Sequence, residues 1–198
     1  MPAQTSNKPV LAVDFDDTLV YNAQRVVEAY NREHSAQVTL NDVYVAEKYG
    51  NPVHGWHHNR AEAREWIRNY LISKEGIDNP PLPGTKAVLA HLRQHYNLVV
   101  VTGRRPNWKS GTDAWLERFM PGFFSAVYHA GHTPKSEVCA EIGANIIIDD
   151  SPHYLSFCVE AGMQTILFGD YPWNQMETLP PGMQRAKNWA EVEEILLG

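Results

Sequence analysis

Three aspartates follow a short apolar segment near the start of the chain. Asp14, Asp16 and Asp17 lie within the run DFDDTL at residues 14–19. Three carboxylates in four residues repel one another unless a cation neutralises them, and magnesium (Mg2+) favours carboxylate, backbone carbonyl and phosphate oxygens. The alternative is an acidic surface loop, which we disfavour because the preceding residues 10–13 (VLAV) are typical of a buried strand. The run therefore predicts a magnesium site.

A second polar segment, Thr102-Gly103-Arg104, ends the apolar run 97–102. A hydroxyl beside backbone N–H groups, opened by a glycine, can form a small cradle for an anion. We expect Thr102, Gly103 and Arg104 to contact substrate there. Two plainer interpretations stay open, an ordinary strand-to-helix turn for the segment and a solvated side chain for Arg104.

Two further charged positions complete the set. Asp149 and Asp150 end the apolar run 145–148, and two acids at a strand end indicate either a cation or the start of a helix. Lys135 precedes the helical pattern that comes before that run. A single lysine is usually solvated, so it is a candidate only in combination with the other positions.

The elements that must position these groups are strands that alternate with helices. Apolar runs predict five strands, at 10–13, 97–102, 125–128, 145–148 and 164–168. Such alternation is typical of a parallel sheet with right-handed crossovers. We therefore predict an α/β fold, a Rossmann-like three-layer sandwich around a five-stranded parallel sheet. The first strand should lie between the strands that end at Thr102 and Asp149.

One region interrupts the alternation. Between residues 20 and 82 the sequence shows helical patterns and no convincing strand, and the proline-rich residues 79–84 return the chain to the sheet. We predict a core domain of residues 1–19 and 83–198 and a helical insertion of residues 20–82. An insertion after the first parallel strand should lie over the ligand crevice.

Taken together, these segments resemble the four motifs of the haloacid dehalogenase-like superfamily, along essentially the whole chain. The pattern Asp14-x-Asp16-x-Thr18 resembles the first motif, and Thr102 the second. Lys135 resembles the third, and the pair at 149–150 the fourth. The chain departs from many members at Asp17, where glycine is common.

The resemblance implies a phosphohydrolase and gives each group a role. Asp14 would attack phosphorus, and Asp16 would act as general acid and then general base. Thr102 and Lys135 would hold the phosphate oxygens. Magnesium would be bound by Asp14, by the backbone carbonyl of Asp16 and by Asp150, with Asp149 as an orienting neighbour.

A narrower resemblance concerns the substrate. The helical insertion is similar to the type-one cap of this superfamily, and residues 170–175 (DYPWNQ) resemble a segment of the 5′(3′)-deoxyribonucleotidase branch and its bacterial relatives. The resemblance implies a nucleoside monophosphate, more readily deoxy than ribo. Trp56 could stack on a base, and His57 in the cluster 54–58 (HGWHH) could face the substrate. A surface loop, packing beneath the cap or a transition-metal site are the alternatives.

Other functions and properties are constrained by composition. A phosphatase for sugar phosphates or other small metabolites stays open, as does a non-catalytic phosphate-binding or phospho-accepting signalling domain. The net charge of −6 argues against extended nucleic acid as a partner. No apolar run is long enough to span a membrane, and two cysteines favour a reducing, cytoplasmic location. The oligomeric state stays open.

Overall fold

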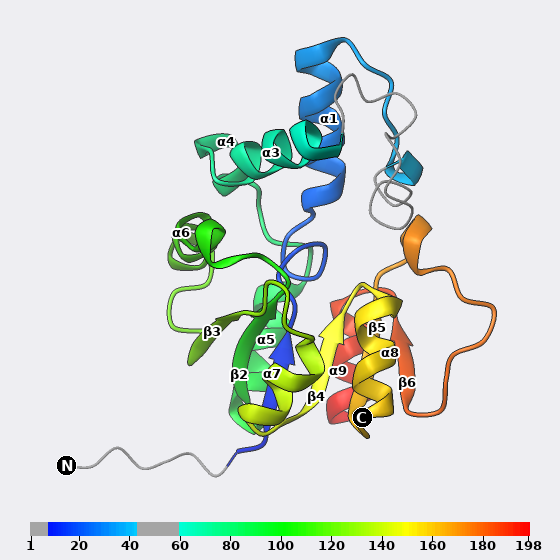
Figure 1. Cartoon of the computed structure of the whole chain (residues 1–198). Coiled ribbons are helices and arrows are strands. Elements are labelled where there is room, and N and C mark those ends of the chain that lie inside the picture. The colour runs from blue at the N-terminus through cyan, green and yellow to red at the C-terminus, as the bar shows by residue number, and fades with distance from the viewer. Residues whose placement is uncertain (1–7, 43–59) are drawn as a thin grey trace.

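The computed structural model describes residues 8–42 and 60–198 (Figure 1). At its centre is a parallel sheet of six strands in the order β3-β2-β1-β4-β5-β6. The strands are β1 (Val10–Val13), β2 (Asn97–Thr102), β3 (Ala126–His129), β4 (Ala144–Asp149), β5 (Gln164–Phe168) and β6 (Met183–Ala186). The first strand lies between β2 and β4, as the sequence predicts, and the α/β Rossmann-like class is confirmed.

The number of strands differs from the prediction, because β6 adds a sixth strand beside β5. Its sequence, MQRA, has no β-branched residue and no continuous apolar run. Met183 and Ala186 are buried, whereas Gln184 is exposed, as expected for a strand at the edge of a sheet. A short edge strand of this kind carries little hydrophobic signal in the sequence.

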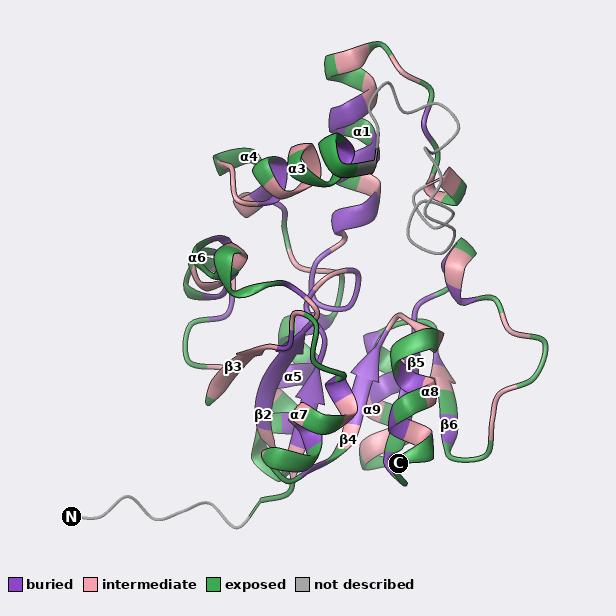
Figure 2. Cartoon of the chain, in the orientation of Figure 1, coloured by how far each residue is buried: buried purple, intermediate pink, exposed green. Residues whose placement is uncertain are grey.

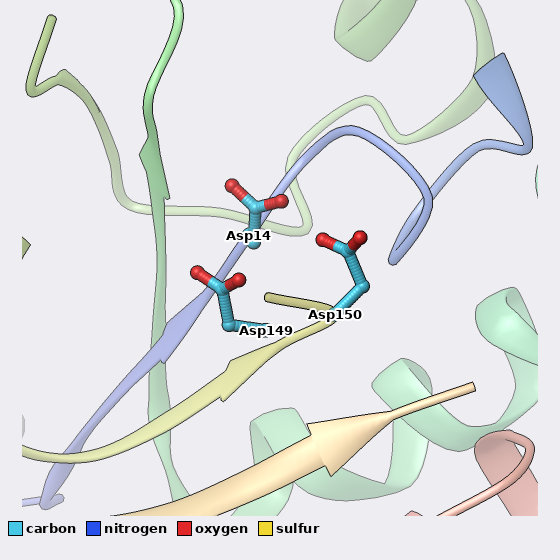
Figure 3. Close-up of side chains that lie close together, drawn as sticks. All are labelled: Asp14, Asp149 and Asp150. Carbon is cyan, nitrogen blue, oxygen red and sulfur yellow. The ribbon is translucent and has the colours of Figure 1, made fainter. Parts of the chain in front are cut away.

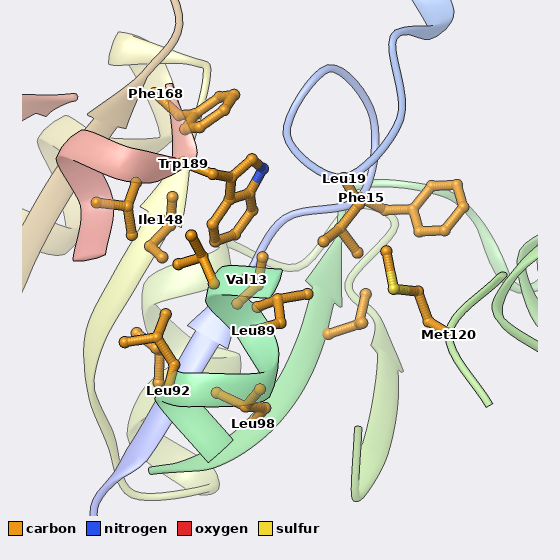
Figure 4. Close-up of a cluster of buried hydrophobic side chains, with 14 of the residues drawn as sticks. Val13, Phe15, Leu19, Leu89, Leu92, Leu98, Met120, Ile148, Phe168 and Trp189 are labelled. Atoms are coloured by element: carbon orange, nitrogen blue, oxygen red, sulfur yellow. The ribbon is translucent and has the colours of Figure 1, made fainter. Parts of the chain in front are cut away.

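Helices cover both faces of the sheet and make the fold three-layered. Successive residues of β1 point to opposite faces, as strand geometry requires. Leu11 and Val13 join a cluster with side chains from α5 (Thr85–His95), α6 (Lys109–Phe119) and α9 (Trp189–Leu197) (Figure 4). Ala12 joins a second cluster with side chains from α7 (Lys135–Glu141) and α8 (Pro152–Glu160). The two clusters together form the core that holds the strand ends in place.

Three helices of the region between β1 and α5 lie beyond the carboxyl ends of the strands (Figure 1). They are α1 (Asn22–His34), α3 (Arg60–Leu71) and α4 (Lys74–Ile77). Two of them, α1 and α3, share a separate apolar cluster that includes Val27, Tyr30 and Tyr70. Each of the two longer helices buries one side and exposes the other, as the colours of Figure 2 show for α1. The region therefore has a small core of its own above the main sheet.

Two short 3-10 helices follow the carboxyl ends of strands. They are η1 (Pro106–Trp108), after β2, and η2 (Pro172–Asn174), after β5. Among the residues that the structure describes, no helix has both the length and the apolar character needed to cross a membrane.

Candidate active site

Three aspartates meet where two central strands end. Asp14 follows β1 directly, Asp149 is the last residue of β4, and Asp150 comes next (Figure 3). One carboxylate oxygen from each of the three lies within 4.8 Å of the other two. We call these three residues the acid cluster. Because β1 and β4 are parallel neighbours, the sheet itself brings their carboxyl ends together.

Lys135 connects two members of the acid cluster. It is the first residue of α7, and its Nζ lies 2.5 Å from Asp14 Oδ1 and 2.6 Å from Asp149 Oδ2. Burial by itself lowers the pKa of a lysine, but the charges of Asp14 and Asp149 outweigh it and raise the pKa of Lys135. The ammonium group is therefore charged, and it restrains both carboxylates.

The acid cluster holds more negative charge than Lys135 can balance. Burial, with the neighbouring carboxylates, raises the pKa values of Asp14 and Asp150, and Lys135 opposes this only in part. A divalent cation bound between carboxylate oxygens removes such an excess, and three hard oxygen ligands suit magnesium. The residues present therefore fit the ion that the sequence predicts.

Asp149 and Asp150 differ in how their oxygens are used. Asp149 accepts hydrogen bonds at both oxygens, from Lys135 Nζ at 2.6 Å and from the backbone N–H of Ser151 at 2.8 Å. Asp150 accepts the indole N–H of Trp173 at Oδ2, with an Nε1–Oδ2 distance of 2.5 Å. The geometry therefore favours Asp150 as the residue of this pair that offers an oxygen to a cation.

Asp16 has a different set of partners. Arg104 donates two hydrogen bonds to it, from Nε to Oδ2 and from Nη2 to Oδ1, both at 2.8 Å. The side-chain amide of Asn22 donates a third, at 2.6 Å. Burial alone raises a carboxyl pKa, but the Arg104 charge and these bonds prevail and hold the pKa of Asp16 below its usual value. Asp16 is therefore an ionised and fully paired carboxylate.

Arg104 is itself fixed from three sides. Besides Asp16, it donates from Nη1 to Thr112 Oγ1 at 3.1 Å, and its guanidinium lies 4.5 Å from the centroid of the Phe15 ring. Its exposed fraction is 5%. The structure thus places the Arg104 guanidinium on Asp16, and contact of Arg104 with a substrate stays a prediction.

The predicted anion cradle at the end of β2 lies beside Lys135. Thr102 is buried, and its hydroxyl accepts the backbone N–H of Arg104 at 3.2 Å. A Cβ atom at Gly103 would lie 3.4 Å from the hydroxyl oxygen of Tyr154 and 3.9 Å from Cε of Lys135. Gly103 therefore keeps a narrow space open next to the lysine.

Tyr154, on α8, is a site residue that the sequence interpretation missed. Its ring centroid lies 4.8 Å from Lys135 Nζ, and its side chain is partly exposed. Tyrosines are common on helix surfaces, so only its position two residues after the Ser151-Pro152 turn could have singled it out.

The backbone conformation and hydrogen bonds of Asp17 explain why aspartate suits a position at which many superfamily members have glycine. Its φ is +53°, in the left-handed region that aspartate tolerates better than most residues. Its carboxylate accepts the backbone N–H of Ala23 at 3.0 Å in the first turn of α1. Tyr171 donates its hydroxyl to the Asp17 carbonyl at 2.8 Å. Asp17 therefore ties the strand end to the first helix of the inserted region.

Trp56 and His57, which the sequence interpretation assigns to substrate binding, lie outside the described residues, as does the rest of the cluster 54–58. The other predicted positions are described, and they fall into two groups. The acid cluster, Lys135, Thr102 and Gly103 lie together, whereas Asp16 and Arg104 form a pair beside them.

Comparisons with known proteins agree with this arrangement at the level of the fold. A haloacid dehalogenase-like hydrolase from Streptococcus pneumoniae superimposes with a TM-score of 0.70 at 17% identity, over 95% of this chain and 98% of that one. The HAD-hydrolase YfnB from Bacillus subtilis, described as bound to magnesium, gives 0.68 at 16% identity, over 96% and 98%. A HAD-superfamily hydrolase of subfamily IA from Geobacter sulfurreducens gives 0.63 at 18% identity, over 96% of each chain.

At the level of sequence, a comparison with curated proteins gives no match. A family model does match, over residues 8–198, and its description is 5′ nucleotidase, deoxy (pyrimidine), cytosolic type C protein (NT5C). With nearly the whole chain covered, this protein belongs to that 5′ nucleotidase family and is a phosphatase, and it has the fold of the haloacid dehalogenase-like hydrolases.

Proposed function

We propose that this phosphatase is a magnesium-dependent 5′-nucleotidase that hydrolyses deoxynucleoside monophosphates through an aspartyl-phosphate on Asp14. The observation that carries the proposal is the acid cluster, in which Lys135 binds Asp14 and Asp149 while Asp150 remains beside them. A magnesium ion held by Asp14, the backbone carbonyl of Asp16 and Asp150 would supply neutralisation of the charge on the phosphate.

The first half of the proposed reaction transfers the phosphoryl group to the protein. An oxygen of Asp14 attacks phosphorus in line, the bond from phosphorus to the ester oxygen breaks, and the leaving oxygen takes a proton from Asp16. Lys135 holds the Asp14 carboxylate at 2.5 Å, which fixes the direction of attack. Thr102 and Lys135 are proposed to hold the non-bridging phosphate oxygens.

The second half returns the protein to its starting state. Asp16 takes a proton from water, which attacks phosphorus, and the bond between phosphorus and Asp14 breaks to release inorganic phosphate. The ionised state of Asp16 beside Arg104 supports this step, since an ionised carboxylate can accept a proton. The first step needs Asp16 in its protonated form. The proposed mechanism therefore requires Asp16 to exchange its bonds with Arg104 for a proton before the leaving oxygen is protonated.

The nucleotide is supported by the family description and by the inserted region. The family description contains the words deoxy and pyrimidine. Deoxypyrimidine nucleoside 5′-monophosphates are therefore the first candidate substrates. We propose that residues 20–82 act as a cap above the acid cluster, since α1 and α3 lie beyond the carboxyl ends of the strands. Base stacking on Trp56 and a substrate contact of His57 stay predictions. The cytosolic term in the family description supports the cytoplasm as the compartment.

A phosphate-release assay tests the proposal. The panel contains 5′-monophosphates of deoxypyrimidine, deoxypurine and ribonucleosides, together with several sugar phosphates, each with excess magnesium and again with EDTA. We expect the highest kcat/KM for a deoxynucleotide, loss of turnover in EDTA and recovery when magnesium is added back. Asp14→Asn is the control for contaminating phosphatase. A preference for sugar phosphates would overturn the substrate class and leave the mechanism standing.

A further inference from the structure

The residues that follow β5 contact the acid cluster from a separate part of the chain. Trp173 lies in η2 and donates its indole N–H to Asp150 Oδ2, with an Nε1–Oδ2 distance of 2.5 Å. The two residues are 23 positions apart in the sequence, and Asp150 follows β4. A direct bond from a neutral donor to a proposed metal ligand is the observation from which this inference starts.

Trp173 is held rigidly enough to orient another side chain. Its ring stacks on Tyr171, with centroids 4.7 Å apart and planes at 14°. Tyr171 is fixed in turn by the bond from its hydroxyl to the Asp17 carbonyl. Gly169 makes room for this arrangement, because its φ is +83° and a Cβ there would lie 2.2 Å from Cε2 of Tyr171.

Asn174 anchors the same turn to the end of the strand. Its side chain is fully buried, and its amide donates to the Phe168 carbonyl at 2.8 Å while its oxygen accepts the Tyr171 N–H at 3.1 Å. The indole of Trp173 therefore projects from a turn whose backbone is fixed by the sheet. The carboxylate that it meets acquires a defined orientation.

The chemistry of the donor matters as much as its position. An indole N–H donates one hydrogen bond and carries no charge, so it can fix Asp150 without balancing the carboxylate. Asp149 differs, because its Oδ2 meets the charged Lys135. We infer that Trp173 is a positioning residue that occupies one oxygen of Asp150 and directs the other towards a divalent cation. This inference rests on the magnesium role in the proposed function.

Direct measurement of metal binding tests the inference without turnover. Mn²⁺, a spectroscopic substitute for Mg²⁺, is titrated into the full chain without substrate, and free Mn²⁺ is followed by electron paramagnetic resonance. Trp173→Phe keeps an aromatic ring and removes the N–H. We expect it to weaken Mn²⁺ binding by about 10–100-fold, as loss of an outer partner of a metal ligand typically does. The magnesium concentration for half-maximal activity should rise similarly, while kcat at saturating magnesium stays near that of the wild type.

Trp115→Phe is the matched control. Trp115 is buried whereas Trp173 is half-buried, but the indole N–H of Trp115 also makes one hydrogen bond, to the Asn79 carbonyl at 2.7 Å, away from the acid cluster. Its loss should leave Mn²⁺ affinity unchanged. A second test uses Asp150→Asn, in whose background Trp173→Phe should have no further effect if Trp173 acts through Asp150.

The outcomes separate this inference from the proposed function. If the wild type does not bind Mn²⁺ or Mg²⁺, the proposed magnesium role fails. If the wild type binds and Trp173→Phe binds equally well, the positioning role of Trp173 is overturned and the proposed function stands. If Trp173→Phe does not melt cooperatively, Trp173→Met offers a flexible apolar side chain without an N–H or O–H donor, and unchanged affinity there would equally overturn the inference.

Discussion

Asp14 and Asp16 are two residues apart and both belong to the end of β1, yet their surroundings are opposite. The Asp14 side chain is 6% exposed and shares one lysine with Asp149, beside a third carboxylate. The Asp16 side chain is 32% exposed and meets a guanidinium in a two-bond contact, with an amide as third donor. Negative charge is in excess around Asp14 and balanced around Asp16.

The contrast separates two chemical roles within one motif. A site with excess negative charge is incomplete until a cation enters, whereas the pair of Asp16 and Arg104 is complete as it stands. Asp14 and Asp16 both lie beyond the last residue of β1, where the backbone turns at Asp17, so the same short segment can supply both sites. We therefore expect changes in the acid cluster to affect metal binding and turnover, and changes in the Asp16–Arg104 pair to affect proton transfer and local stability.

The largest expected effect is that of Asp14→Asn, which replaces the proposed nucleophile with an amide. Turnover should fall by on the order of 10⁴-fold or more, as loss of other enzymatic nucleophiles does. The fold should persist, because the amide retains the shape and removes charge from a crowded site. Phosphate release and circular dichroism on the same sample are the measurements. A rate near that of the wild type would exclude Asp14 as nucleophile.

Asp16→Asn should have the next largest effect, a loss of about 10²–10⁴-fold in kcat, because proton transfer is removed while the nucleophile remains. The loss should be larger for a nucleoside monophosphate than for p-nitrophenyl phosphate, whose leaving group needs no proton. The comparison of the two substrates is the measurement. An equal loss for both would mean that Asp16 does not protonate the leaving oxygen.

Magnesium should stabilise the protein through the acid cluster. At a concentration of 100 times Kd it should add about 2.7 kcal/mol to the free energy of unfolding, or roughly 5–10 °C in Tm for a protein of this size. Asp150→Asn should lose most of this shift, and Arg104→Gln should keep it. Differential scanning fluorimetry with and without magnesium measures both. Loss of the shift in Arg104→Gln would remove the distinction between the two sites.

Arg104→Gln should have the smallest effect, a loss of about 1–2 kcal/mol in the free energy of unfolding, because Asp16 loses its charged partner. The exposed neighbour Arg105 is the control, and Arg105→Gln should change stability by less than about 0.5 kcal/mol. Arg104 lowers the pKa of Asp16, so its stabilisation exists above the ordinary aspartate pKa. It is lost as pH falls through the lowered value. Denaturant unfolding at several pH values should show the two variants converging in acid.

Much of the fold follows from the sequence because buried parallel strands appear as continuous apolar runs. The strands β1, β2 and β5 occupy the predicted residues, and β4 is longer by one residue at each end. The edge strand β6 escapes prediction because only Met183 and Ala186 of MQRA are buried, one in each core cluster, which leaves neither an apolar run nor an alternation. Local periodicity cannot reveal a strand whose partner is supplied by the rest of the sheet.

The candidate active site also has a part that the sequence predicts and a part that it does not. Residues at strand ends could be grouped from the sequence, because a parallel sheet gathers its carboxyl ends at one edge. Their partners could not be predicted. Arg104 turns towards Asp16 because Phe15 and Thr112 fix its guanidinium. Trp173, which follows β5, donates to Asp150, which follows the neighbouring strand β4. Both contacts depend on packing between distant segments.

Asp14 is proposed to carry the phosphoryl group, and chemical trapping of that group shows whether it does. Asp16→Asn is mixed with magnesium and excess p-nitrophenyl phosphate, quenched in acid within one turnover and reduced with borohydride, which converts an acyl phosphate to an alcohol. Peptide mass spectrometry then locates the reduced residue. We predict reduction at position 14, and none in the double variant that also carries Asp14→Asn. If the wild type releases product under the same conditions and no reduced Asp14 is found in the wild type or in Asp16→Asn, Asp14 does not accept the phosphoryl group.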